Sequence, residues 1–318
     1  MPADGALSLM RLIPFVNLLF WSALALPACA GERPGEARIE DVKVYKGTFA
    51  TVNSFIFSNG RELLVLDVQR KPDEARKLVE EIRRIGLPLR TVLISHGHTD
   101  HFTGMGVFRQ EFPEARIVVA NDDIKRDIKA YAVYMDSGGA TGGEPALDPS
   151  IKPKSPEYPQ GFDYEGNIKA LGSNRLELPA GGTLELTTDY LPTEADYMTT
   201  VYSPDLNALF LSDLGYNKVH HWLGDDISWQ DIANWRQELG RLKREYADRN
   251  PVVYPGHGDP ADMSLFDESI RYLDDYTRVM KGATSREAAM REMIALYPDY
   301  KEANFFLKYS VENHVKEP

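Results

Sequence analysis

The sequence predicts an α/β fold, because short apolar runs typical of strands alternate with segments whose apolar residues follow helical spacing. Runs of the first kind stand at 62–67, 91–95 and 117–120, and a helical segment separates the first two. A second observation is that His96, a residue suited to metal binding, directly follows one of these runs. Because α/β enzymes place their sites at strand ends, both observations favour this class.

Local signals predict the elements before residue 135. Residues 51–57 and 62–67 are β-rich and flank Ser58-Asn59-Gly60, a good hairpin turn. Pro72 opens a helix with regular apolar spacing, and Gly86 ends it. The further expected elements are a strand at 91–95, a helix at 103–111, a strand at 117–120 and a helix capped by Asn121.

The middle of the chain lacks periodicity. Residues 135–166 contain five prolines and a glycine-rich stretch, which predicts an insertion, and long loops of this kind often act as lids. The expected later elements are strands at 183–188, 199–203, 208–212 and 251–254, and helices at 228–247, 262–281 and 285–297. We therefore expect one domain over 36–318, with the insertion at about 135–166 and a helical C-terminal extension at about 283–318.

The composition narrows the possible functions. Of 318 residues, 43% are hydrophobic and 26% are charged, which is ordinary for a globular protein with a sizeable core. The formal net charge of −12 argues against nucleic-acid binding and against a polybasic membrane-surface protein. A single cysteine excludes a disulfide framework. We expect an acidic protein that acts on a small-molecule substrate.

The N-terminal region predicts export. Residues 12–26 are apolar and follow Arg11, but they are too few for a bilayer-spanning helix of ~20 residues. They fit the apolar core of a secretory signal peptide, which we place at 1–30. Cleavage after small residues and lipidation of Cys29 are both compatible with the sequence. The expected location is the periplasm, either free or lipid-anchored through Cys29, without an integral membrane domain.

The most informative segment is His-Gly-His-Thr-Asp-His at 96–101, which contains three of the seven histidines. Imidazole and carboxylate groups are ligands that zinc accepts, and their compact spacing can serve two adjacent metal positions. The segment follows an apolar strand, whose end can hold several side chains toward one point. We expect metal binding by His96, His98, Asp100 and His101. A solvated loop that is rich in histidine is the alternative.

This motif resembles the HxHxDH signature of the metallo-β-lactamase fold superfamily, and the resemblance extends over about 40–282. It implies a four-layer αβ/βα sandwich with the metal site at one edge, between its two sheets. Asp67 matches the acidic residue that ends an early strand, although Gln69 stands where glycine is usual. Asp213 matches the metal-bridging aspartate of the family, and His257 matches its last metal ligand.

One implied ligand departs from the family pattern. Most members have a histidine in a turn before the bridging aspartate, where this chain has Glu194. Alkylsulfatase-type members look similar, with a Thr-Glu-Ala turn at this place. The resemblance implies a first metal on His96, His98 and Glu194, and a second on Asp100, His101 and His257, with Asp213 between them. An exposed glutamate beside an empty site is the alternative.

Residues that follow Asp213 are candidates for the substrate pocket. His220 and His221 are adjacent, so at most one faces the metals, and we favour His221. The expected substrate-binding residues are Tyr216, Lys218, His221 and Trp222.

The resemblance implies a hydrolase with two metal ions, expected to be zinc, with iron or manganese as alternatives, and the N-terminal region predicts that it is exported. A metal-bridging hydroxide would attack an ester-type bond in a carboxylic ester, lactone, thioester or sulfate ester, with Asp100 and His221 as catalytic residues. The alternatives are a mononuclear iron dioxygenase of sulfur compounds, a β-lactamase and a non-catalytic metal-binding protein. The β-lactamases of this fold usually have Cys or Ser in place of Asp213 and histidine in place of Glu194, which favours esters.

Glu194 leads to the first testable prediction. It adds a carboxylate beside Asp100 and Asp213 and so lowers the positive charge of the site. The pKa of the bound water should then lie above the ~7 of a strongly activating zinc site, which shifts the rate profile to alkaline pH. Glu194→Gln should lose the first metal and most activity, whereas Glu194→His should retain metal and move the acidic limb to lower pH. Full metal occupancy and turnover in Glu194→Gln would show that Glu194 is not a ligand.

Overall fold

A computed structural model of the protein describes residues 38–139, 147–224 and 227–316. The contacts within the chain place these residues in one compact unit, Glu36–Pro318. The expected signal peptide and Cys29 lie outside the described residues, as does part of the expected insertion. Among the residues described, no helix has both the length and the hydrophobicity needed to cross a bilayer.

The first sheet presents the carboxyl ends of parallel strands at one edge. Its six strands, in spatial order, are β1 (Asp41–Lys46), β2 (Asn53–Ser58), β3 (Leu63–Leu66), β4 (Leu89–Leu93), β5 (Arg116–Val119) and β6 (Ile168–Ala170). β1 to β3 are antiparallel and β3 to β6 are parallel, which confirms the predicted β2–β3 hairpin. Asp67 and the segment 96–101 follow β3 and β4 directly, so the fold brings them to the same edge.

The second sheet contributes the later candidate ligands. Its order is β11 (Val252–Gly258), β10 (Ala208–Asn217), β9 (Thr200–Ser203), β8 (Thr183–Thr187) and β7 (Arg175–Glu177). The sequence predicts that β10 and β11 end at 212 and 254, but both strands continue, so Asp213 and His257 lie within strands rather than after them. Glycine, proline and polar residues in these extensions hide the strand pattern.

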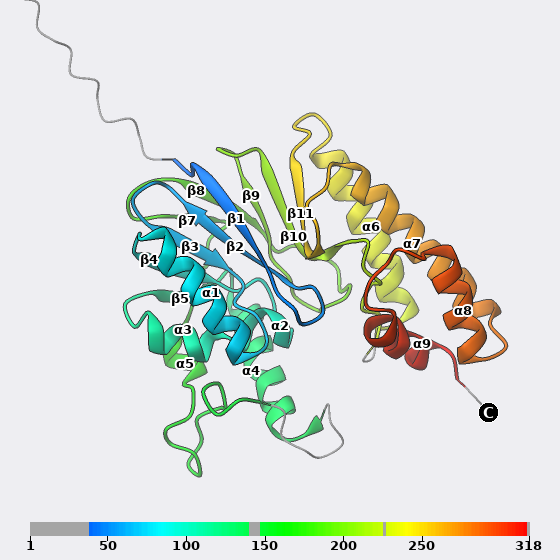
Figure 1. The fold of residues 1–318 in the computed structure, drawn as a ribbon, viewed down its shortest axis with the longest axis horizontal. Coiled ribbons are helices and arrows are strands. Elements are labelled where there is room, and N and C mark those ends of the chain that lie inside the picture. Colours follow the sequence, from blue (N-terminus) through cyan, green and yellow to red (C-terminus); the bar gives the residue numbers. More distant parts are fainter. Residues whose placement is uncertain (1–37, 140–146, 225–226, 317–318) are drawn as a thin grey trace, which may run out of the picture. The chain divides into compact units, whose positions relative to one another are not determined.

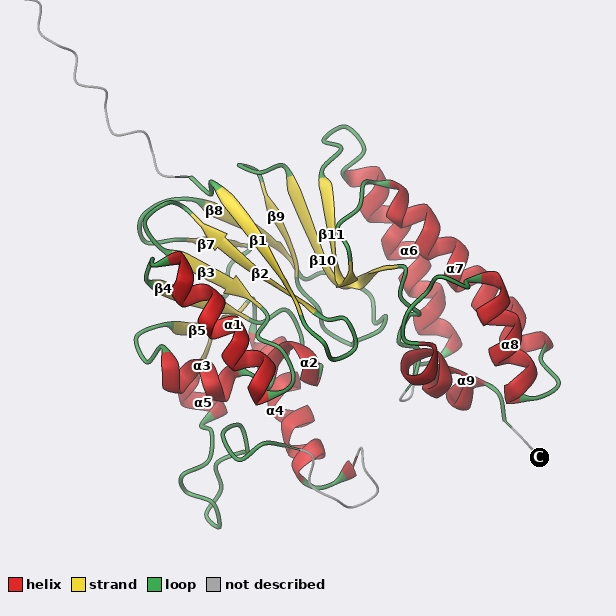
Figure 2. Cartoon of the chain, viewed as in Figure 1, coloured by secondary structure: helices red, strands yellow, loops and turns green. Residues whose placement is uncertain are grey.

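Helices cover the outer faces of both sheets and complete four layers (Figures 1 and 2). On the first sheet they are α1 (Pro72–Ile85), α2 (Thr99–Phe102), α3 (Met105–Glu111), α4 (Asp122–Asp136) and α5 (Tyr164–Asn167). On the second sheet lie α6 (Trp229–Glu245) and α7 (Ser264–Gly282), followed by α8 (Arg286–Leu296), the π-helical turn η2 (Ala303–Leu307) and α9 (Lys308–His314). The predicted αβ/βα sandwich is confirmed.

The helix boundaries follow from the local signals. Pro72 is in the first turn of α1, and Gly86 ends that helix with a φ of 80° in the left-handed region. Asn121 caps α4 by accepting a hydrogen bond from the Ile124 N–H. The strands β6 and β7 and the helices α2 and α5 have no expected counterpart, because each is only three or four residues long. β1 also has none, whereas η2 and α9 lie in the region 283–318, where a helical extension is expected.

Aromatic side chains fill the space between the sheets. Phe55 and Phe57 come from β2, and Phe210 and Tyr254 come from β10 and β11. The Phe210 ring centre lies 4.9 Å from Phe55, 4.8 Å from Phe57 and 4.6 Å from Tyr254. A second core lies between the second sheet and the helices α6 and α7. The two cores hold β4, β10 and β11 in position for the residues at their ends.

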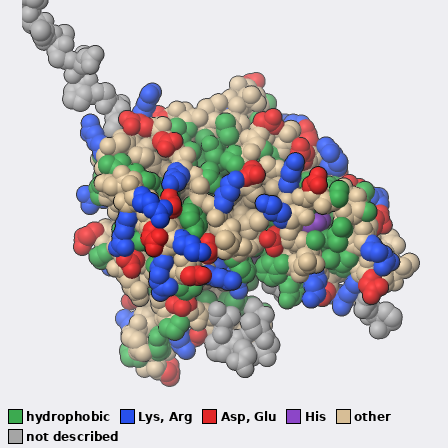
Figure 3. Space-filling model, viewed as in Figure 1, with side chains coloured by type: hydrophobic (Ala, Val, Ile, Leu, Met, Phe, Trp, Pro, Cys, Tyr) green, Lys and Arg blue, Asp and Glu red, His purple; other side chains and the backbone are tan. Residues whose placement is uncertain are grey.

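Basic and acidic side chains are mixed on the surface (Figure 3). On α1, the exposed Arg84 pairs with the exposed Glu80 and with Glu81, which is half-buried. Exposed pairs of this kind contribute little to stability because water and salt screen them. The stability of the fold therefore depends mainly on the two apolar cores.

The inter-sheet core can be tested at Phe210, which is fully buried. Phe210→Ala should lower the free energy of unfolding by about 3–5 kcal/mol, because it removes a buried ring and leaves a cavity. Val252→Ala on the neighbouring strand is the control, since Val252 is 47% exposed and should change stability far less. Urea unfolding of both variants measures the difference, and equal losses would contradict this account of the core.

Candidate metal centre

Strand ends and one loop bring the candidate ligands together. His96 follows β4 and His98 stands at the N-terminus of α2, whose first turn contains Asp100 and His101. The other candidates are Asp213 in β10, His257 in β11 and Glu194 in the loop between β8 and β9. Residues far apart in the sequence thus meet at one edge of the sandwich.

Asp213 lies at an irregular point of β10. Ser212 has a φ of 51°, and the pairing of β10 with β11 shifts its register here. A Cβ atom on Gly256 of β11 would lie 2.1 Å from Asp213 Oδ1. The missing side chain at Gly256 therefore leaves room for the carboxylate, and the bulge turns it toward the histidines.

The chain turns sharply after β3, and Gln69 takes the conformation expected of a glycine. Asp67 and Gln69 have φ values of 62° and 72°, where glycine is favoured. The Gln69 Nε2 donates a hydrogen bond to Ser54 Oγ at 2.8 Å, which holds the turn in place. Although Gln69 replaces the glycine that is usual in the family, the backbone keeps the conformation in which Asp67 hydrogen-bonds His101.

The first ligand group is formed by His96, His98, Glu194 and Asp213, whose ligand atoms lie within 4.8 Å of one another. His96 Nε2 is 3.8 Å from Glu194 Oε2 and 3.7 Å from Asp213 Oδ2. His98 Nδ1 is 2.7 Å from Glu194 Oε1. The Glu194 side chain is only 1% exposed, so the alternative of an exposed glutamate is wrong.

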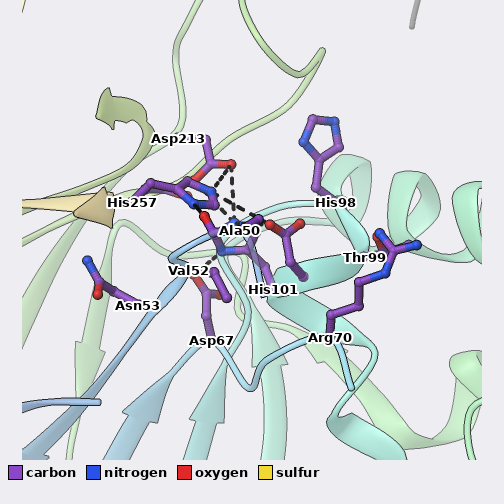
Figure 4. Close-up of polar contacts among 12 residues, drawn as sticks. Ala50, Val52, Asn53, Asp67, Arg70, His98, Thr99, His101, Asp213 and His257 are labelled. Atoms are coloured by element: carbon purple, nitrogen blue, oxygen red, sulfur yellow. Dashed lines mark hydrogen bonds and ion pairs between the residues drawn. The ribbon is translucent and has the colours of Figure 1, made fainter. Parts of the chain in front are cut away.

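The second group consists of Asp100, His101 and His257. His257 Nε2 is 3.6 Å from Asp100 Oδ2 and 3.3 Å from Asp213 Oδ2. His101 Nε2 is 3.1 Å from Asp213 Oδ1. Figure 4 shows His101 and His257 both directed at the Asp213 carboxylate. Asp213 therefore adjoins both groups.

Hydrogen bonds orient the imidazole rings from behind. His101 Nδ1 donates to Asp67 Oδ2 at 2.8 Å, and His257 Nδ1 donates to the Ala50 carbonyl at 2.6 Å (Figure 4). Ser95 Oγ donates to Asp67, so it accepts from His96 Nδ1 at 2.9 Å. Each ring then directs its Nε2 to the centre, which is the orientation that metal-binding histidines require.

The donor set fits two divalent ions. His96 Nε2 and Glu194 Oε2 are buried and have no hydrogen-bond partner among the described residues. Ligands about 2.0–2.1 Å from a tetrahedral zinc ion lie about 3.3 Å apart, close to the separations of 3.1–3.8 Å measured for five of the pairs, whereas His98 Nδ1 and Glu194 Oε1 are closer, at 2.7 Å. The structure therefore supports metal binding by both groups.

Burial and neighbouring charge shift the pKa values of these groups. Burial lowers the pKa of His96 and raises the pKa of Glu194 to about 7. Burial also lowers the pKa of His98, but the Glu194 carboxylate outweighs it and raises that pKa to about 9. Burial raises the pKa of Asp213, but His101 and His257 outweigh it and hold that pKa well below its usual range. The buried carboxylates thus need positively charged neighbours to remain ionised.

A cavity of about 240 Å³ opens onto both ligand groups. Its polar lining includes Arg70, Thr99, Asp100, Glu194 and Asp213, and its apolar and aromatic lining includes Phe49, Tyr131, Met135, Tyr216, Trp222, Phe305, Phe306 and Tyr309. Arg70 is the one arginine or lysine among the described lining residues. A substrate would meet the metal centre at the bottom of a largely aromatic cavity.

The structure places two of the four expected substrate-binding residues in the cavity, Tyr216 and Trp222. The prediction that Lys218 binds substrate is wrong. The chain turns at this residue, whose φ is 53°, and the side chain is exposed and outside the cavity lining. The prediction that His221 faces the metals in the substrate pocket is also wrong. Its buried ring stacks between Tyr216 and Tyr272, with ring centres 4.7 and 4.2 Å away, and it does not line the cavity.

Several residues that line the cavity could not be predicted from the sequence. Arg70, Phe49 and the aromatic residues of η2 and α9 carry no motif, and they reach the cavity only through the packing of distant segments. A partial signal exists for Tyr131, which flanks the aromatic insertion, and its ring centre lies 5.9 Å from His98.

A family model described as the metallo-beta-lactamase superfamily matches residues 47–257. A linear primary-alkylsulfatase of Pseudomonas sp. (strain ATCC 19151) is 24% identical over 242 residues, which cover 68% of this chain and 44% of that protein. The uncharacterized protein YobT of Bacillus subtilis (strain 168) is 25% identical over 72 residues, 23% of this chain and 30% of its own length. The matches thus span less than half of either relative.

A solved structure supports the fold assignment. It is described as a metallo-beta-lactamase from Pontibacter korlensis and superposes with a TM-score of 0.50. The match covers 74% of this chain and 94% of the other, at 15% sequence identity. At this identity the likeness concerns the fold alone.

The role of Asp67 can be tested separately from the ligands themselves. Asp67→Asn should weaken the binding of one of two zinc ions by about 10–100-fold, because the amide no longer holds His101 as a carboxylate does. Competition with a chromophoric chelator measures both affinities. Asp267→Asn is the control, since this exposed carboxylate pairs with Lys243 away from the site. Unchanged zinc affinity in Asp67→Asn would refute the orienting role.

Proposed function

The chain belongs to the metallo-beta-lactamase superfamily, and we propose that it is a metal-dependent hydrolase that cleaves an ester-type bond of a small molecule with two zinc ions. The convergence of two ligand groups on Asp213 at the bottom of one cavity carries this proposal. We include export in it, on the evidence of the apolar stretch at 12–26.

The residues have distinct roles in this proposal. His96, His98 and Glu194 would hold the first ion, and Asp100, His101 and His257 the second, with Asp213 shared. When bound, the ions would lower the pKa of a water molecule and polarise the scissile group.

The chain's own side chains supply the proton transfer and the orientation. Asp100 lines the cavity, and its Oδ2 lies 3.6 Å from His257 Nε2, so it is placed to accept a proton from the attacking water. The Tyr216 hydroxyl donates to Asp213 Oδ2 at 3.3 Å and fixes that carboxylate. His221 has no catalytic role in this scheme, because its ring packs behind Tyr216.

The cavity favours a substrate that bears negative charge. The Arg70 guanidinium lies 4.7 Å from the centre of the Phe49 ring and also hydrogen-bonds Thr99 Oγ1, so it is held at the cavity wall. Guanidinium groups bind carboxylates and sulfate-like groups well. The alkylsulfatase relative supports sulfate esters as one of the ester types to be tried, beside carboxylic esters, lactones and thioesters.

A panel of chromogenic substrates tests the proposal on zinc-reconstituted protein. Elemental analysis should find more than one metal equivalent per chain, and at least one ester type should be hydrolysed faster than a β-lactam. Chelation should abolish turnover, and zinc should restore it. His257→Ala should lower kcat/KM by about 100-fold or more, while the control Leu296→Ala, on the outer side of α8, should not.

Two results would contradict the proposal. One iron per chain without zinc, together with oxygen-dependent oxidation of a sulfur compound, would favour the mononuclear dioxygenase. Two bound ions with no turnover on any substrate class would favour a metal-binding protein.

A further inference from the structure

The C-terminal segment returns to the candidate metal centre after α8. The chain leaves α8, passes residues 297–302 and enters η2 and α9 (Figure 1). This segment lies beyond residues 47–257, which match the superfamily model. Three of its aromatic side chains, Phe305, Phe306 and Tyr309, line the same cavity as Asp100 and Asp213.

Backbone contacts hold the segment in place. Lys301 N donates to the Lys218 carbonyl and His220 N donates to the Lys301 carbonyl, both at 3.0 Å, just after β10 ends. Further along, the Tyr276 hydroxyl of α7 donates to the Ser310 carbonyl at 2.6 Å, and Leu223 N donates to Ser310 Oγ at 2.8 Å. The aromatic rings therefore form a fixed wall.

The wall extends from the metal centre to the cavity mouth. Phe306 is buried, and its ring centre lies 5.2 Å from that of His257. Phe305 is half-buried, 5.5 Å from Phe49 and 5.8 Å from Trp222. Tyr309 is 43% exposed, so the wall offers apolar surface to whatever enters the cavity.

This arrangement has an energetic consequence for binding. Phe306 completes the packing against His257, but Phe305 and Tyr309 leave ring surface uncovered. Apolar surface that a ligand removes from water contributes affinity in proportion to its area. Aromatic rings suit this purpose because they lose little conformational entropy when they bind.

We propose that Phe305 and Tyr309, with Trp222 and Phe49, bind an alkyl chain on the non-reacting side of the substrate and thereby select esters that carry one. The selection among esters rests on the proposed function, whereas the binding of the alkyl group does not. The C-terminal segment then contributes Phe305 and Tyr309 to specificity, and the superfamily-matched part of the chain supplies the metal centre together with Phe49 and Trp222.

Binding of n-alkylphosphonates from methyl to octyl tests the proposal without hydrolysis. Isothermal titration of the zinc-loaded protein should show Kd falling by up to about fourfold per added methylene until the wall is covered. Phe305→Ala and Tyr309→Ala should flatten this dependence and leave methylphosphonate binding unchanged. Leu296→Ala is the matched control, because this side chain is in the same C-terminal region and outside the cavity.

Turnover separates this proposal from the proposed function. With p-nitrophenyl esters from acetate to octanoate, KM should fall with chain length in the wild type, and the KM for octanoate should rise in Phe305→Ala. A chain-length-independent Kd, or equal effects of Phe305→Ala and Leu296→Ala, would overturn the wall as a binding site. Length-dependent phosphonate binding without hydrolysis of any ester would sustain the wall and refute the ester hydrolase.

Discussion

The buried carboxylate of Asp213 is the group on which the candidate centre depends. It lies 3.7 Å from His96 Nε2 and 3.3 Å from His257 Nε2, so it joins both ligand groups. Several ionisable groups share this interior, and such burial is unfavourable unless opposite charges stand beside them. The bulge at Ser212 and the missing side chain at Gly256 give the carboxylate its place. Divalent ions would balance the carboxylates that gather there.

A column of stacked rings extends from this centre into the helical layer. The rings of His257, Tyr216, His221, Tyr272 and Tyr300 follow one another at centre distances of 4.8, 4.7, 4.2 and 5.7 Å. Burial lowers the pKa of His221 to about 3, so its ring is neutral and stacks as an aromatic spacer. Its position near Asp213 in sequence suggests catalysis, but its packing makes it part of the support for His257.

The chain combines two sources of structure at one cavity. The superfamily-matched part supplies the sandwich, the histidines and the carboxylates. That part also supplies Phe49, in the loop after β1, whereas the segment after α8 supplies Phe305, Phe306 and Tyr309. Metal chemistry requires donors at fixed separations and tolerates little change, whereas apolar contact is non-directional. Aromatic side chains beside the centre can therefore change without moving the donor atoms of the ligands.

The sequence by itself determined the α/β class, the hairpin around Asn59, the helix ends at Gly86 and Asn121, and the ligand motif at 96–101, because these depend on local spacing and short motifs. Glu194, Asp213 and His257 carry no such local motif, and only the resemblance to the family pointed to them. The tertiary structure alone decided that β10 and β11 continue through Asp213 and His257, that Glu194 is buried, and that His221 and Lys218 lie outside the cavity. It also decided that Phe305 and Arg70 line the cavity. These outcomes depend on which distant segments pack together, and no local pattern of polarity specifies that.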